Sequence, residues 1–185
     1  PIRMLLPMIS TVGEVQEVRE IVARVRRRLR RRGISVGDHL PPIGVMIEVP
    51  GAALAADALA GVSDFFAVGT NDLTMYTLAI DRSDEQVAHL YDPLHPAVLR
   101  LIQFSAQAAL RARIPISLCG EMAGDPRYTA LLLGLGVREL SMSSANLKGD
   151  VQSRSTKASA LPATPSAASS ACCQTPHLGA SSVAK

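Results

Sequence analysis

The chain has 185 residues, of which 48% are hydrophobic and 3% aromatic, with a formal net charge of +3. This composition is typical of a globular protein, and the length favours one domain. No apolar run approaches the roughly 20 residues that span a bilayer, and the amino end lacks a charged leader with an apolar stretch, so we expect a cytoplasmic protein with no membrane partner. The three cysteines are too few for a disulfide scaffold, which fits a reducing compartment.

Hydrophobic periodicity predicts strands that alternate with helices along the chain. Thr11 and Glu14 have the spacing of a capping box, which predicts a helix start, and Gly33 stands where that helix should stop. Pro96 is placed at the first turn of a later helix. In chain order we expect a strand at 4–9, a helix from 11 to 33, a strand at 44–48, a helix at 52–60, a strand at 65–69 followed by a polar loop, a helix from 96 to 110, a strand at 116–120, a helix at 128–135 and a strand at 139–142.

Five strands separated by helices imply a parallel sheet, either open or part of a barrel. The glycine fingerprint of a dinucleotide fold is missing, because Gly134 and Gly136 lie at a helix end. Polar groups follow three strands, at Glu48, at Asn71 and Asp72, and at Cys119, and barrel enzymes draw their catalytic groups from several strand ends. A (β/α)8 TIM barrel needs eight strands in about 250 residues, so we predict a partial α/β barrel, about strands 4 to 8.

Two segments have unusual composition. Six arginines lie in residues 26–32, which could indicate a nucleic-acid partner, but acidic residues stand at the other end of the same predicted helix and complement its dipole. We interpret the run as a solvated helix face and expect no nucleic-acid partner. Residues 147–185 are rich in Ser, Ala, Thr and Pro and are predicted to be disordered, which divides the chain into a barrel domain at 1–146 and a tail.

Six motifs resemble, in order, the carboxyl-terminal half of enzyme I of the sugar phosphotransferase system. They are GVMIEVP at 44–50, GTNDLT at 69–74, AIDR at 79–82, YDPLHP at 91–96, LCGEMAGDP at 118–126 and LSM at 140–142. Pyruvate phosphate dikinase and phosphoenolpyruvate synthase look like more distant relatives that share the Asn-Asp and Cys-Gly elements, and membership of that group is an alternative. The resemblance implies a phosphoenolpyruvate-binding barrel whose parent enzyme transfers the phosphoryl group to a protein histidine and releases pyruvate.

The same resemblance implies a role for five residues. Glu48 and Asp72 match the family's magnesium ligands, and a Mg²⁺ site needs few carboxylates together with substrate oxygens. Asn71, with the backbone of Asp72, matches a phosphate contact, and Arg82 matches a substrate arginine whose planar fork suits phosphate or carboxylate. Cys119 matches the proton donor to the enolate, and a thiol with an ordinary pKa of about 8.5 is protonated at neutral pH.

Each of these residues also has a simpler interpretation. Glu48 can cap a helix that begins near Pro50, and Asp72 can form a turn with Asn71. A lone cysteine such as Cys119 is often a small buried hydrophobe, and Arg82 alone would be a solvated surface charge.

The resemblance further implies partners and marks departures from the family. The complete enzyme works with a phosphohistidine domain and a phosphocarrier protein, and this half of the family's chain supplies homodimer contacts. The early strands and their substrate arginines are missing here, and Met75 stands where relatives commonly have glutamine. We therefore expect the fragment alone to be inactive, with a non-catalytic remnant or dimerisation module as the alternative.

Overall fold

The computed structural model describes residues 2–37 and 39–146. Its centre is a parallel sheet of five strands, which are β1 (Met4–Leu6), β2 (Ile43–Ile47), β3 (Phe65–Gly69), β4 (Ile116–Cys119) and β5 (Glu139–Ser141). Each strand pairs with the next one in the sequence, from β1 to β5 without a reversal. A doubly wound open sheet reverses its strand order at a switch point. The unreversed order is therefore that of a barrel segment, which confirms the predicted partial barrel.

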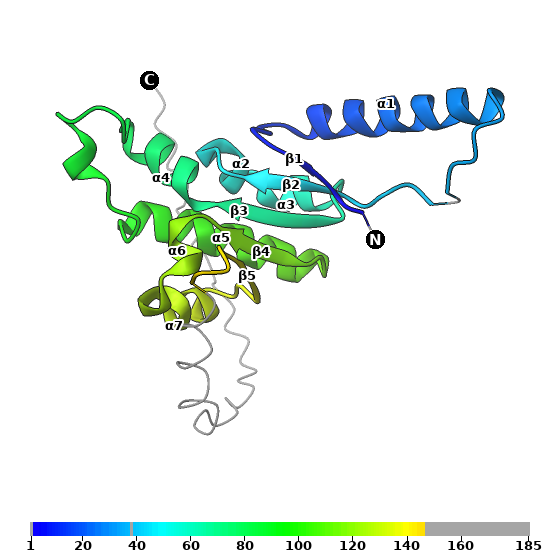
Figure 1. Cartoon of the computed structure of the whole chain (residues 1–185). Coiled ribbons are helices and arrows are strands. Elements are labelled where there is room, and N and C mark those ends of the chain that lie inside the picture. The colour runs from blue at the N-terminus through cyan, green and yellow to red at the C-terminus, as the bar shows by residue number, and fades with distance from the viewer. Residues whose placement is uncertain (1, 38, 147–185) are drawn as a thin grey trace, which may run out of the picture.

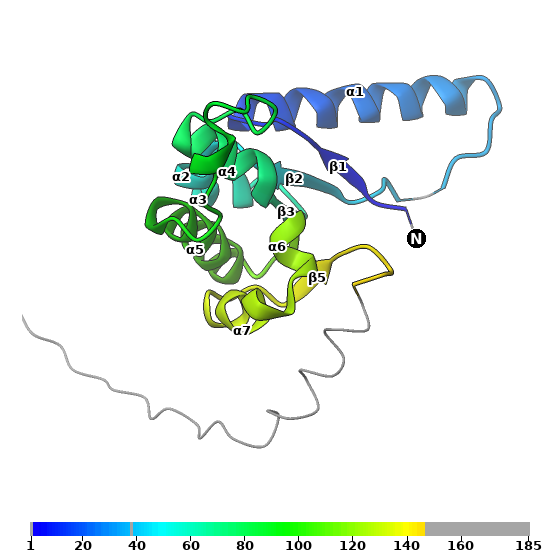
Figure 2. The same cartoon turned by 60° about the vertical axis from the view of Figure 1, so that its left-hand side comes forward.

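Helices connect the strands and flank the sheet (Figure 1). α1 lies beside the β1 end of the sheet and α7 beside the β5 end, as Figure 2 also shows. None of the described helices is long and apolar enough to cross a membrane. The helices are α1 (Val12–Arg31), α2 (Pro50–Leu54), α3 (Ala56–Ala60), α4 (Thr70–Leu78), α5 (Pro96–Ala112), α6 (Glu121–Gly124) and α7 (Pro126–Gly134), with a short 3-10 turn, η1 (Ala88–Leu90), before α5.

Helix ends follow the local chemistry of the sequence. The predicted capping box is present, because the Glu14 carboxylate accepts hydrogen bonds from the backbone N–H groups of Ser10 and Thr11. α1 ends at Arg31, and Gly33 takes the left-handed conformation with φ 73° that terminates many helices. Asp125 caps α7 by accepting a hydrogen bond from the Arg127 N–H.

The two faces of the sheet have different side chains. Val45, Ile47, Phe66, Val68 and Leu118 are buried in the hydrophobic core with residues of the helices. Side chains alternate along a strand, and the register pairs Ile47 with Val68 and Val68 with Leu118. The residues between these positions therefore point to the opposite face of the sheet. In a closed barrel, that face would line the interior.

Two predicted elements have different bounds in the structure. The strand predicted at 4–9 ends at Leu6, because Pro7 has no N–H for the ladder and Met8 has a positive φ of 55°. The helix predicted at 52–60 is two short helices that meet at Ala55. Residues 147–185, predicted to be a disordered tail, lie outside the described residues.

The polar loop predicted after Gly69 is wrong, because α4 begins there. The hydroxyl groups of Thr74 and Thr77 donate to the carbonyl oxygens of Thr70 and Leu73, four residues earlier, so the polar side chains hydrogen-bond within the helix. Leu73 is fully buried and anchors the helix to the core. Tertiary packing thus overrides the weak helical propensity of this segment.

Candidate functional site

The carboxyl ends of three neighbouring strands carry the predicted site residues. Glu48 directly follows β2, Asn71 and Asp72 lie in the first turn of α4 after β3, and Cys119 ends β4. The register places Ile47 beside Val68 and Gly69 beside Cys119, so these strand ends meet at one edge of the sheet. We call the set of Glu48, Asn71, Asp72 and Cys119 the carboxyl rim.

Glu48 is a buried carboxylate, with only 3% of its surface exposed. Burial raises the pKa of Glu48, and the nearby Asp72 carboxylate raises it further. The backbone N–H of Met8 opposes this rise, because it donates a hydrogen bond of 2.7 Å to Oε1. The alternative interpretation of Glu48 as a helix cap is wrong, because the N-cap residue of α2 is Val49 and no side chain makes a capping hydrogen bond there. Gly69 is needed beside Glu48, since a Cβ at Gly69 would lie 2.9 Å from Oε2.

The Glu48 and Asp72 carboxylates form an oxygen donor pair. The described residues hold no group of three or more His, Cys, Asp or Glu side chains that could bind a metal. This donor set does not fit a closed zinc site, which needs four nitrogen or sulfur ligands. It fits Mg²⁺, which is bound by one or two carboxylates and keeps several other oxygen ligands.

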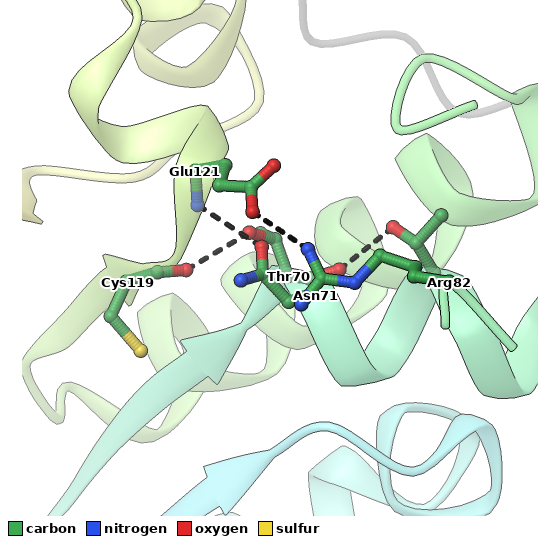
Figure 3. Close-up of polar contacts among 6 residues, drawn as sticks. Thr70, Asn71, Arg82, Cys119 and Glu121 are labelled. Atoms are coloured by element: carbon green, nitrogen blue, oxygen red, sulfur yellow. Dashed lines mark hydrogen bonds and ion pairs between the residues drawn. The ribbon is translucent and has the colours of Figure 1, made fainter. Parts of the chain in front are cut away.

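Asn71 is oriented by the turn that follows β4 (Figure 3). Its Oδ1 accepts a hydrogen bond of 3.0 Å from the backbone N–H of Glu121, which leaves the Nδ2 amide group to donate elsewhere. The neighbouring Thr70 hydroxyl donates to the carbonyl oxygen of Cys119 at 3.0 Å. Gly120, with φ 105°, permits this close approach, because a Cβ there would collide with Thr70 and Asn71.

Cys119 is partly buried, and its Sγ lies 3.4 Å from the carbonyl oxygen of Val68. Burial raises the pKa of the Cys119 thiol, and the negative charges of Glu48 and Asp72 raise it further. The thiol therefore keeps its proton at neutral pH. A protonated thiol at a strand end can act as a proton donor.

Arg82 lies after α4 and is not a freely solvated charge. Its Nη1 pairs with Oε1 of Glu121 at 2.7 Å (Figure 3), and its guanidinium carbon lies 5.3 Å from the ring centre of Tyr91. Burial raises the pKa of the Tyr91 phenol, although a hydrogen bond with Thr74 lowers it.

Sequence reasoning missed two of these residues. It included Tyr91 and Glu121 only as parts of motifs and gave neither a role. The position of Glu121, two residues after the strand-end cysteine, was the one available signal for a place near the site.

Comparison with known proteins gives one family and one fold. A family model described as "PEP-utilising enzyme, PEP-binding domain" matches residues 1–156. The chain is 48% identical over 147 residues to the phosphoenolpyruvate-protein phosphotransferase of Cupriavidus necator, an alignment that covers 80% of this chain and 25% of that protein. The enzyme of the same name from Geobacillus stearothermophilus is 44% identical over 146 residues, which are 79% of this chain and 25% of that protein. The chain thus spans about a quarter of the length of these relatives.

A solved structure supports the fold alone. The crystal structure of a citrate lyase from Burkholderia xenovorans LB400 matches with a TM-score of 0.58 and 21% sequence identity, over 83% of this chain and 48% of that chain.

Proposed function

This chain belongs to the family of PEP-utilising enzymes, in the part described as the PEP-binding domain, and we propose that it binds phosphoenolpyruvate for phosphoryl transfer to a protein histidine. The observation that carries the proposal is the carboxyl rim, where a buried carboxylate, a second carboxylate, an oriented amide and a protonated thiol meet. Barrel enzymes keep their chemistry at this end of the strands.

With a bound cation, the rim would suit the negative charge of the substrate. Phosphoenolpyruvate has a phosphate and a carboxylate close together, so its site needs positive charge and hydrogen-bond donors. Glu48 and Asp72 would hold one Mg²⁺, which supplies neutralisation of the phosphate and of the developing enolate. The Nδ2 group of Asn71 and the N–H of Asp72, in the first turn of the nine-residue helix α4, would donate to phosphate oxygens. Arg82 would contact the phosphate or the carboxylate through its planar fork.

Cys119 would complete the reaction. When the phosphoryl group leaves for the histidine, the enolate of pyruvate remains. The Cys119 S–H bond breaks and a C–H bond forms at the methylene carbon, which yields pyruvate and a thiolate that regains its proton from solvent. The raised pKa of the Cys119 thiol keeps the thiol protonated until the enolate forms.

The whole reaction requires parts beyond this chain. The family resemblance implies a phosphohistidine domain, a phosphocarrier protein and a second subunit. We propose that residues 1–146 contribute the metal, phosphate and proton-donor groups to that assembly. A non-catalytic module that keeps these residues is the competing hypothesis.

Binding of the substrate separates the two hypotheses. Phosphoenolpyruvate is titrated calorimetrically into the 185-residue chain, once with MgCl₂ and once with EDTA. We expect binding that requires magnesium and that Asp72→Asn abolishes. Failure of the chain to bind in magnesium would favour the non-catalytic module.

A further inference from the structure

Glu121 holds Arg82 by its side chain and Asn71 by its backbone (Figure 3). The proposed reaction assigns no role to Glu121. The Glu121 carboxylate nevertheless pairs with Nη1 of Arg82, the arginine that is proposed to contact the anionic substrate. A negative group of the protein therefore stands where a negative group of the substrate would bind.

The two members of this ion pair differ in how firmly they are held. The Glu121 side chain is 70% exposed, whereas the Arg82 side chain is 35% exposed and also lies against the Tyr91 ring. If the pair opens, the Glu121 carboxylate can enter water at little cost, because it is already largely solvated. Arg82 keeps its contact with Tyr91 and stays at the rim.

The ion pair of Arg82 with Glu121 has fewer hydrogen bonds than a comparable ion pair elsewhere in the molecule. Arg82 meets Glu121 through one nitrogen, Nη1. Arg111, by contrast, holds Asp57 through both Nε and Nη2 in a bidentate pair between α5 and α3. A phosphate or carboxylate can engage two guanidinium nitrogens at once. An anionic ligand can therefore replace a single contact to Glu121 with a stronger one.

The backbone contact of Glu121 does not depend on its side chain. Its N–H donates to Oδ1 of Asn71, and Gly120 allows the turn to approach Thr70 and Asn71. A substitution of glutamine for Glu121 removes the charge, keeps the size of the side chain and preserves the bond that orients Asn71. The two contributions of Glu121 can thus be separated by experiment.

We propose that the Glu121 carboxylate pairs with Arg82 before the substrate binds and competes with the anionic substrate for this arginine. The inference rests on the proposed function, because it names the ligand group that displaces Glu121. Competition for Arg82 and repulsion of the substrate's charge act in the same direction. Both make the resident carboxylate lower the affinity of the site for a phosphate-bearing ligand.

The test compares two substitutions that each neutralise one exposed carboxylate of an ion pair. Glu121→Gln acts at the rim, and Asp57→Asn breaks the remote pair with Arg111. Phosphoenolpyruvate, and separately inorganic phosphate, are titrated into the full 185-residue chain and both variants in magnesium at low and high KCl. We expect Glu121→Gln to tighten binding of both ligands by about two- to fivefold, the factor that an exposed ion pair is worth. The gain should shrink at high KCl because salt screens exposed charges, and Asp57→Asn should match the unchanged chain.

A purely structural role for Glu121 would weaken binding or leave it unchanged, and either result overturns the proposal if the unchanged chain binds phosphoenolpyruvate. If Asp57→Asn tightened ligand binding equally, the effect would come from net charge alone, and this result would also overturn the proposal. Absence of binding of both ligands by the unchanged chain and by Glu121→Gln would contradict the proposed function and the role of Glu121 together. Thermal melts of the three proteins exclude unfolding as the cause of a loss.

Discussion

The carboxylates at the two ends of the parallel sheet have different partners. At the amino ends of β2 and β3, Asp64 pairs with Arg19 and also accepts a hydrogen bond from the N–H of Ile43. At the carboxyl rim, Glu48 lies beside Asp72, and within residues 2–37 and 39–146 neither has a basic side chain as partner. At the amino end the carboxylate is paired within the chain, whereas the two carboxylates at the carboxyl rim lack a basic partner among the described residues.

From this difference we expect the amino end of the sheet to contribute mainly to stability and the carboxyl rim mainly to function. Unneutralised like charges in a buried place cost stability, and such costs are typical of functional sites. Substitutions at the carboxyl rim should therefore change activity more than stability, and those at the amino end should do the reverse. Activity can be measured in a chimera in which residues 1–146 replace the matching quarter of the C. necator relative.

The largest effect is expected at Cys119. Cys119→Ala in the chimera should lower pyruvate formation by about 100- to 10,000-fold, because a positioned general acid contributes that much. Binding of phosphoenolpyruvate and magnesium should persist, since the thiol is not among their proposed contacts. Stopped-flow assays of pyruvate release, together with calorimetry, measure the two quantities. Normal pyruvate release by this variant would remove the thiol from the mechanism.

Glu48→Gln should change activity and stability in opposite directions. Turnover of the chimera should fall on the order of 100-fold, because a proposed metal ligand becomes neutral. The melting temperature should rise, since burial disfavours the Glu48 charge and glutamine can still accept the Met8 hydrogen bond. Calorimetric melts of the 185-residue chain test the second expectation, and a lower melting temperature would show that the charge stabilises the fold.

Asp64→Ala is the corresponding change at the amino end. It removes the partner of Arg19 and leaves the partly buried N–H of Ile43 without its acceptor. The free energy of unfolding should fall by about 1–3 kcal/mol, the cost of an unsatisfied buried group. Urea denaturation measures this loss, while the affinity for phosphoenolpyruvate should stay the same below the transition. A selective loss of affinity would erase the distinction between the two ends.

The smallest effect is expected far from the rim, at the end of α1. Gly33 has φ 73°, and a Cβ there would meet no atom within 4 Å, so Gly33→Ala introduces backbone strain without a collision. The free energy of unfolding should fall by about 1 kcal/mol in urea denaturation. The activity of the chimera should not change, and a change would indicate that α1 is coupled to the site.

The sequence predicted what depends on local patterns and missed what depends on packing. Strand positions and the gathering of Glu48, Asn71, Asp72 and Cys119 followed from apolar runs that end in polar groups, because parallel strands end at one edge. The helix from Thr70 was not predicted, since its polar residues form internal hydrogen bonds that become visible only in three dimensions. The pair of Arg82 with Glu121 joins residues 39 positions apart, and nothing local signals such a contact.

The proposed reaction depends on one cation shared by Glu48 and Asp72 at the carboxyl rim. Electron paramagnetic resonance with Mn²⁺, a substitute for Mg²⁺, counts the ions bound by the 185-residue chain in the presence of phosphoenolpyruvate. We expect one bound Mn²⁺ per chain and none in Asp72→Asn, with Asp57→Asn as the control that keeps the ion. Equal binding of Mn²⁺ by the unchanged chain and by Asp72→Asn would contradict this expectation.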